Sequence, residues 1–401
     1  MKYNFDEIVS RRNTFSLKWD YGEFLRKVGI TERFDEDTIP VHTADMDFRC
    51  AQPISDALKK LAEHNIYGYT AVFPQGTGLE YYNAVIGWFK KRRNWSINPE
   101  EIVYVDGTVE AVKLAIYAFT GKGDGILLNR PIYSPFTYVI ERSGRTVVNS
   151  QLKNARNDGY YTMDFEDFEI KAAHHDTKLF ILCHPHNPTG RIWTDEELKR
   201  MVEICRKHQV IIVSDEIHGD LIRKDQEFHP LATVVDPAGI ITCTAVNKTF
   251  NLAGLHATNV VIQDNKLRER FVKSIGLIMP NPFTVAAVIA AYTEGEEWLE
   301  QLQDYIDGNI EWVLDFLESQ MPKVKCYRPQ GTYIMWMDFR DYGLSAGEIH
   351  QKIYIDANVV LEGGTMFDPD NGAGFERICV PTSRMVLKEV FARIAREFEG
   401  F

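Results

Sequence analysis

Four side chains suited to imine and proton chemistry stand at or just behind apolar runs of the sequence. Tyr133 lies in "NRPIYSP", Asn187 in "HNPTG", Asp215 at the end of "VIIVSD" and Lys248 in "TAVNKTF". A lysine whose pKa is lowered by burial can form an imine with an aldehyde. A carboxylate can keep a proton on a ring nitrogen, an amide can donate to a phenolate oxygen, and an aromatic side chain can stack on a ring. The four residues therefore predict imine chemistry with an aromatic aldehyde.

A glycine turn before an apolar helical pattern adds a place for a phosphate. In "VYVDGTVEAVKLAIYAF", Gly107, Thr108 and Val109 would present backbone N–H groups at the start of a helix. Helix starts of this kind bind phosphate through those groups and the helix dipole. Pyridoxal phosphate needs all five features, so the sequence predicts this cofactor.

Each of these residues alone has a more ordinary interpretation. A lysine is usually a surface residue. Asp215 suits a helix N-cap, Asn187 before a proline suits a turn, and Tyr133 suits packing in a core. Only the combination favours a cofactor site.

The residues need a scaffold that brings separate strand ends together. The segments "TKLFILCHPHNPTG", "HQVIIVSDEIHGD" and "GIITCTAVNKTFN" each read as a β-strand followed by a polar turn. Between the first two, Thr194 and Glu197 predict the capping box of an amphipathic helix. Such β-α-β units form parallel sheets that bind ligands at the carboxyl ends of their strands. Asn187, Asp215 and Lys248 should therefore share one cleft.

The pattern of segments predicts an α/β protein with two domains and an N-terminal arm. Residues 46–286 alternate strands and helices and should form a large domain with a mostly parallel central sheet. Residues 287–401 carry long helical runs, the short strands "GTYIMWMDF" and "GFERICV" and a closing amphipathic helix, which indicates a smaller α+β domain. Residues 1–45 are too short for a domain and should pack on the small one.

Composition excludes several classes of function. The formal net charge is -12, which gives no general attraction to nucleic acid or to anionic membranes. No apolar run reaches the roughly 18 residues of a membrane span. Six scattered cysteines without a C-x-x-C pair predict reduced thiols in a cytoplasmic protein. His184, His186 and His218 lack a matching cysteine or carboxylate pattern, so we expect no metal.

The motifs resemble those of the fold-type I pyridoxal-phosphate enzymes, which have the aspartate aminotransferase-like fold. Among these, the chain is similar to the MalY/PatB family of cystathionine β-lyases and cystalysin-like cysteine-S-conjugate β-lyases. The resemblance extends over nearly the whole length and rests on these motifs: "SLKWD", "ADMDF", "YGYT", "HNPTGRIWTDEEL", "SDEIHGDL", "NKTFNLAGL", "GTYIMWMDFR" and "GFERI". It implies cleavage of the Cβ–S bond of L-cystathionine or a related L-cysteine derivative to pyruvate, ammonia and a thiol.

The resemblance also implies roles for individual residues. Lys248 would be the Schiff-base lysine and catalytic base, Asp215 the partner of the ring nitrogen and Asn187 that of the phenolate oxygen. Tyr133 would stack on the ring and assist catalysis, and His218 would contact the cofactor.

Further residues would bind the substrate or link two subunits. Arg377 would pair with the α-carboxylate of the substrate, in a pocket that Ala44 and Asp45 also line. Tyr69 would reach the phosphate in a neighbouring subunit, which implies a homodimer with shared active sites.

Two positions depart from the family pattern, and two other functions stay open. Asn247 replaces a usual serine before the lysine, and Cys379 replaces the asparagine of Arg-Ile-Asn. The same residue set serves aminotransferases, which would require a 2-oxo acid acceptor. Family membership alone also allows a MalY-like regulatory role through protein contact.

Overall fold

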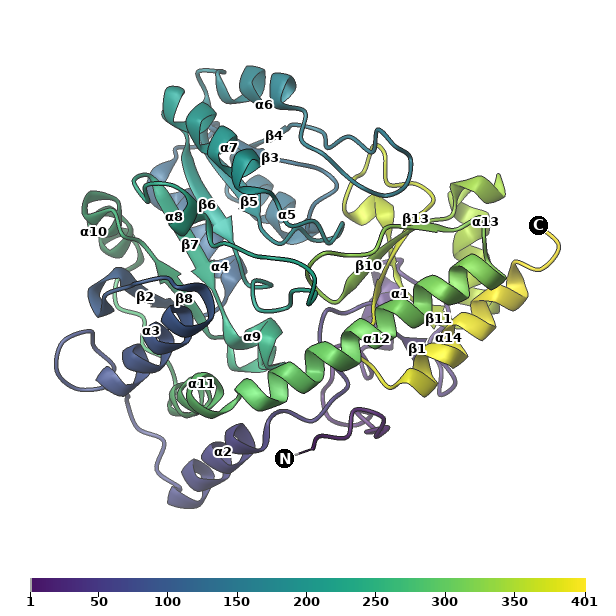
Figure 1. Ribbon diagram of the computed structural model, residues 1–401, viewed down its shortest axis with the longest axis horizontal. Helices are drawn as coiled ribbons and strands as arrows, with labels where there is room; N and C mark the ends of the chain where they lie inside the picture. Colours follow the sequence, from purple (N-terminus) through teal and green to yellow (C-terminus); the bar gives the residue numbers. More distant parts are fainter. Residues whose placement is uncertain (1) are drawn as a thin grey trace.

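The computed structural model describes residues 2–401 and contains a large and a small β-sheet (Figure 1). The large sheet has seven strands in this order: β2 (Ile102–Val105), β8 (Thr258–Val261), β7 (Ile240–Thr244), β6 (Ile211–Asp215), β5 (Thr177–Cys183), β3 (Gly125–Leu128) and β4 (Thr146–Asn149). Only β8 runs against its neighbours, and the other pairs are parallel. The predicted mostly parallel sheet is confirmed.

Helices cover both faces of this sheet, which explains why its strands are apolar throughout. Along β3 and β5, Ile126 and Leu179 join one buried cluster, whereas Leu127 and Phe180 join another. The first cluster includes side chains of α4 (Thr108–Phe119), α5 (Ser134–Arg142) and α10 (Asn265–Ile275), and the second includes those of α6 (Phe165–Ala172), α7 (Asp195–Lys207) and α8 (Leu231–Val234). Successive side chains of a strand point to opposite faces, so both faces need apolar residues.

The helix predicted between β5 and β6 is α7, and it begins as the sequence indicates. Thr194 Oγ1 accepts from the Glu197 backbone N–H at 3.2 Å, and Glu197 Oε2 accepts from the Thr194 N–H at 2.8 Å. The capping box is confirmed.

The small sheet is antiparallel and carries the two strands predicted in the C-terminal part. Its order is β12 (Glu362–Gly363), β13 (Phe375–Cys379), β10 (Ile334–Asp338) and β9 (Lys325–Cys326). Met335, Met337 and Ile378 share a core with α12 (Glu296–Gln320) and α14 (Arg384–Glu397). Trp336 and Phe375 join the core of the large sheet instead. The small sheet therefore presents its second face to the large one.

The N-terminal residues pack against the C-terminal part. Strand β1 (Ile39–Pro40) pairs in parallel with β11 (Val359–Val360), and Phe5 packs edge-on to Trp298 of α12. These contacts support the expected arm, of which Met1 lies outside the described residues. The boundaries 1–45, 46–286 and 287–401 stay a prediction.

The remaining helices complete the scaffold. They are α1 (Gly22–Lys27), α2 (Gln52–His64), α3 (Leu79–Arg93), α9 (Val246–Thr249), α11 (Pro282–Glu294) and α13 (Ala346–His350). Helices α2 and α3 both pack on α11, at the lower left of Figure 1. Within residues 2–401, no helix combines the length and apolar character that a bilayer span requires.

Candidate active site

Three adjacent strands bring Asn187, Asp215 and Lys248 to one edge of the large sheet. Cys183 and Asp215 are paired at the ends of β5 and β6, and Asp215 is also paired with Cys243 of β7. Asn187 follows β5 by four residues, and Lys248 lies in the short helix α9 just beyond β7. The carboxyl ends of parallel strands meet at the same edge, so the sheet topology produces the shared cleft that the sequence predicts.

The amino group of Lys248 lies inside the protein and contacts the N-terminal arm. Its Nζ donates to the backbone carbonyl of Ala44 at 2.7 Å. Burial lowers the pKa of Lys248, and the positive charge of Arg377 lowers it further, against the opposing effects of Cys379, Asp45 and Asp215. A lysine with a lowered pKa is more often the free amine that a nucleophile or base must be.

Asp215 is a buried carboxyl group that lacks a cation. Burial raises its pKa to about 7, although the Ile217 backbone N–H and the charge of Lys248 act in the opposite direction. The Ile217 N–H donates to Oδ1 at 3.3 Å. Within residues 2–401, no basic side chain forms an ion pair with Asp215. A protonated ring nitrogen would supply the missing positive charge.

Tyr133 and His218 lie in the same cleft. Tyr133 is partly buried, and burial raises its pKa to about 12. The ring of His218 lies 5.7 Å from that of Tyr333 in an edge-on arrangement, and burial lowers its pKa well below the ordinary value. His218 Nδ1 is buried, and no described residue bonds to it. A neutral imidazole with an unused nitrogen is therefore available to a ligand.

The start of α4 has the features of the predicted phosphate site. Gly107 has φ 107°, a conformation that favours glycine, and it caps the helix. Within residues 2–401, the backbone N–H groups of Thr108 and Val109 have no acceptor, whereas the Gly107 N–H, also expected to be a phosphate donor, donates to the Val105 carbonyl at 2.8 Å. His256 lies beside this turn, because a Cβ placed on Gly107 would be 3.8 Å from its Nδ1. These donors fit a phosphate, just as Asp215 and His218 fit a pyridine ring.

Arg377 reaches the cleft from the small sheet. Its guanidinium is buried, with Nη1 donating to Asn187 Oδ1 at 3.3 Å and Nη2 donating to the His42 carbonyl at 2.8 Å. Arg377 also forms an ion pair with Glu362, and Phe367 lies against it at 4.9 Å. The structure therefore places a cation next to Asn187, at the opposite side of the cleft from the large sheet.

The segment with Ala44 and Asp45 is fixed by an ion cluster from the N-terminal arm. Arg11 pairs with Asp45 at 2.6 Å, and the fully buried Lys18 pairs with Asp47 at 2.9 Å. Asn251, three residues after Lys248, exchanges two hydrogen bonds of 2.9 Å with the backbone of Met46. These contacts hold the Ala44 carbonyl over Lys248.

Tyr69 is the predicted site residue that is not brought to the cleft of its own chain. It lies in the loop between α2 and α3 with 99% of its surface exposed, and it bonds to none of the described residues. Its predicted role in a neighbouring subunit stays a prediction.

The two residues that depart from the family pattern find ordinary partners. Asn247 Oδ1 accepts from the Ala257 backbone N–H at 3.4 Å. Cys379 Sγ contacts the His42 carbonyl at 3.4 Å, the same atom that accepts from Arg377. Neither replacement leaves Arg377 or Lys248 without its contacts.

The histidines considered for metal binding are separated by their partners. His184 bonds to the His229 carbonyl, and His186 bonds to Thr189. Within residues 2–401, one group of three possible ligands lies close together, the exposed His174, His175 and Asp176. This group is outside the cleft and contains none of the predicted site residues.

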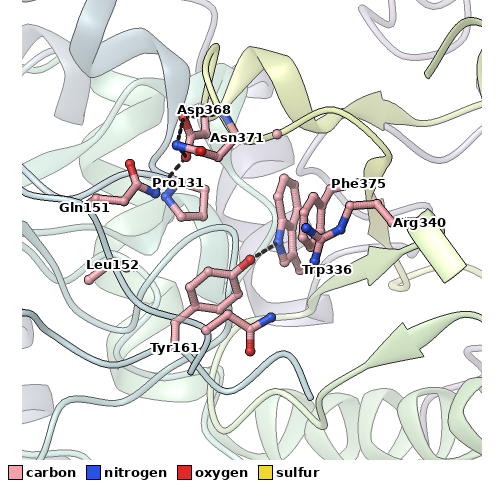
Figure 2. Close-up of a pocket in the computed structure, with 11 residues that line it drawn as sticks. Pro131, Gln151, Leu152, Tyr161, Trp336, Arg340, Asp368, Asn371 and Phe375 are labelled. Carbon is pink, nitrogen blue, oxygen red and sulfur yellow. Dashed lines mark hydrogen bonds between the residues drawn. The ribbon is translucent and has the colours of Figure 1, made fainter. Parts of the chain in front are cut away.

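A cavity of about 190 Å³ lies between residues of the large-sheet region and of the small sheet (Figure 2). Pro131 lines it, and Trp336 stacks on Phe375 at 5.2 Å while donating to Tyr161 Oη at 3.2 Å. Its polar groups already bond to one another, as Gln151 does to Asp368 at 2.8 Å. None of the predicted site residues lines this cavity.

Three contributors to the cleft were missed from the sequence. Tyr333 Oη donates to the Ala44 carbonyl at 2.8 Å, His42 offers its carbonyl to Arg377, and Glu362 pairs with Arg377. Tyr333 lies in a strand segment whose alternate positions are all apolar or aromatic, so no pattern marks it. Glu362 precedes two glycines and therefore resembles a turn residue. The one signal that could have indicated a functional acid is its place directly after the apolar run in "NVVL".

Comparison with known proteins agrees with this geometry. The family model for aminotransferase class I and II matches residues 37–394. Cystathionine beta-lyase PatB from Bacillus subtilis is 40% identical over 397 residues, covering 98% of each chain. The structure of cystalysin from Treponema denticola, which contains pyridoxal 5'-phosphate, has a TM-score of 0.92 at 32% identity and covers 99% of both chains. The pyridoxal-phosphate-bound C-S lyase from Staphylococcus hominis has a TM-score of 0.90 at 33% identity, covering 100% of this chain and 99% of the other.

These matches extend over both sheets and over the N-terminal arm. They reproduce the resemblance that the motifs around Asp215, Lys248 and Arg377 indicate. The predicted aspartate aminotransferase-like fold is confirmed. The chain belongs to the aminotransferase class I and II family, among the relatives of the PatB and cystalysin type.

Proposed function

We propose that this protein is a pyridoxal-phosphate-dependent carbon–sulfur β-lyase. It cleaves the Cβ–S bond of L-cystathionine or a related L-cysteine derivative and releases pyruvate, ammonia and a thiol. The observation that carries the proposal is one cleft in which Lys248, Asp215 and Arg377 converge. The similarity to cystathionine beta-lyase PatB over the whole chain supports the reaction type.

The cleft has a partner for each part of pyridoxal phosphate. Lys248 would hold its aldehyde carbon, Asp215 its ring nitrogen, Asn187 its phenolate oxygen and Tyr133 one face of the ring. The N–H groups of Thr108 and Val109 at the Gly107 turn suit the phosphate, and His218 Nδ1 is free to contact the ring. When bound, the cofactor supplies an electron sink for negative charge at the substrate Cα.

The steps up to loss of the thiolate are each assigned to a residue of the chain, and the aminoacrylate that is released then takes up water to give pyruvate and ammonia. Arg377 holds the α-carboxylate and so orients the Cα–H bond toward Lys248. Once its Nζ is free, Lys248 takes the Cα proton as a general base. The Ala44 carbonyl, 2.7 Å from Nζ, keeps the amino group in place while the thiolate leaves from Cβ. The carboxylate of Asp215 would keep the ring nitrogen of the cofactor protonated throughout.

The active form in this proposal is a cytoplasmic homodimer with shared sites. Large apolar side chains are exposed in the same loop region as Tyr69, namely Ile66, Tyr67 and Phe73, and Thr70 of this loop bonds to the Pro280 carbonyl, three residues after the exposed Leu277. Such a patch is typical of a subunit interface. All six cysteines are free, which agrees with a reducing compartment.

The decisive experiment measures pyruvate and free thiol from L-cystathionine. Purified protein is supplied with pyridoxal phosphate and with no 2-oxo acid. Equal release of pyruvate and thiol supports the β-lyase, and Lys248→Ala is the control that must abolish both release and the absorption band of the bound cofactor. A cofactor-loaded protein that releases neither product contradicts the proposal.

An aminotransferase is the second candidate, because the family model that matches the chain bears that name. Transfer of the amino group only after a 2-oxo acid is added would identify it. Lys248, Asp215 and Arg377 would then keep their roles.

A further inference from the structure

Glu362 is an acid built into the carboxylate-binding side of the cleft. Strands β12 and β13 pair Glu362 directly with Arg377, so both side chains leave the same face of the sheet. The two side chains form an ion pair, in which Arg377 is 1% exposed and Glu362 18% exposed. Among the described residues, Glu362 has no other hydrogen-bond or ion-pair partner.

The guanidinium of Arg377 has little capacity left for a second anion. Nη2 serves both the His42 carbonyl and Glu362, and Nη1 donates to Asn187. Phe367 lies against the guanidinium, and the buried Nε is the nitrogen without a protein partner among residues 2–401. A substrate carboxylate that approaches Arg377 therefore meets a carboxylate already in place.

Two carboxylates at one buried guanidinium repel each other. Glu362 must take up a proton or turn away before a ligand can use Arg377 fully, and either change weakens ligand binding. The titratable groups close enough to influence Glu362 electrostatically are Arg377, Lys248, Cys379, Tyr133, Tyr354 and, from the other face of the sheet, Glu376. Burial raises the pKa of Glu362, whereas Arg377 and Lys248 act in the opposite direction.

We infer that Glu362 is a specificity-determining residue that competes with carboxylate ligands for Arg377. An L-amino acid has a second attachment in its α-amino group, whereas a 2-oxo acid such as pyruvate depends mainly on its carboxylate. The competition therefore weakens the binding of the product pyruvate. It also weakens the binding of other 2-oxo acids, which then do not act as amino acceptors. The inference rests on the proposed role of Arg377.

The test compares pyruvate binding to the cofactor-loaded wild type and to Glu362→Gln by calorimetry. The amide keeps the shape of the side chain but not its charge, so pyruvate should bind about tenfold more tightly. Unchanged or weaker binding to the variant would overturn the inference. Glu376→Gln is the matched control, because Glu376 is the next acid along β13, lies on the opposite face and accepts from Tyr354 Oη at 2.6 Å.

One further measurement separates the possible failures. Arg377→Lys must lose pyruvate binding; if it binds pyruvate as the wild type does, the proposed carboxylate site is wrong and the inference falls with it. Neither titration requires turnover, so the result does not depend on which reaction is catalysed.

If Glu362→Gln does not fold, the wild type alone decides the matter. Pyruvate affinity should rise as the pH falls from about 8 to about 5, since protonation of Glu362 removes its competing charge. An affinity that stays constant over this range overturns the inference.

Discussion

Lys248 and Tyr333 donate to the same acceptor, the backbone carbonyl of Ala44, at 2.7 and 2.8 Å. Lys248 comes from the side of the large sheet, and Tyr333 immediately precedes strand β10 of the small sheet. The arm residue between them thus connects the catalytic lysine with both sheets. Because two donors share one oxygen, a change in either affects the other.

Tyr333→Phe removes one donor and leaves the carbonyl to Lys248 alone. The oxygen then stabilises the protonated amine better, so the pKa of Lys248 should rise and turnover near neutral pH should fall by about tenfold. The measurement is the pH dependence of turnover, whose rising limb should move to higher pH. Tyr354→Phe removes a buried hydroxyl that bonds to Glu376 and should leave the limb where it is. A limb that moves equally in both variants would contradict this account.

Arg377→Lys keeps the charge but loses the planar fork. A lysine cannot hold a carboxylate in two parallel hydrogen bonds, so KM for the amino acid should rise about 100-fold with a smaller loss in kcat. Steady-state kinetics over a wide range of substrate concentrations measure both. A loss confined to kcat would show that Arg377 does not bind the ground-state carboxylate.

Mixed dimers test the shared site at Tyr69. Tyr69→Ala and Lys248→Ala should each be inactive as pure proteins. After unfolding and refolding together, half of the dimers are hybrids, and each hybrid has one intact site, so activity should return to about a quarter of the wild-type value. No recovery from a mixture that is shown to contain hybrids would place Tyr69 outside the partner's site.

Glu216→Gln should reduce the pH dependence of stability. Glu216 is buried, with Oε1 accepting from Ser214 Oγ at 2.8 Å and from the Leu231 N–H at 3.0 Å, and burial raises its pKa to about 8. The unfolded chain loses this proton at lower pH than the native protein does. The free energy of unfolding therefore falls as the pH rises from about 5 to about 8, and the variant removes that share of the slope.

Urea unfolding at several pH values measures the slope. The exposed Glu203 on α7 provides the control, and Glu203→Gln should unfold with the wild-type dependence. A Glu216→Gln protein whose slope equals that of the wild type would show that Glu216 ionises equally in both states.

The large sheet could be predicted because its strands carry strong local signals. The runs that end at Cys183, Asp215 and Thr244 are largely apolar and stop at polar turns. These features indicate three buried strands and their order along the chain. The positions of Asn187, Asp215 and Lys248 follow from that order alone. A rule of sheet topology therefore sufficed for this half of the site.

The other half depends on contacts between segments far apart in the chain. Glu362 and Arg377 meet through the register of β12 and β13, and no local pattern indicates which residues two short strands will pair. Tyr333 directly precedes a strand that is buried on both faces, so alternation of polar and apolar residues does not distinguish it. Such residues become visible only when the strands are paired.

The carbonyl of Ala44 belongs to the main chain, so no replacement of the side chain at position 44 can delete it. Substitutions can disturb this contact only indirectly, by displacing the segment that carries the carbonyl. That segment is held by Asn251 and by the ion cluster of Arg11, Lys18, Asp45 and Asp47. A mutational scan should therefore find Arg11, Lys18 and Asn251 sensitive, although none of these side chains donates to that carbonyl. The position of this acceptor depends on the residues that fix the backbone around it. A list of functional side chains would therefore omit it.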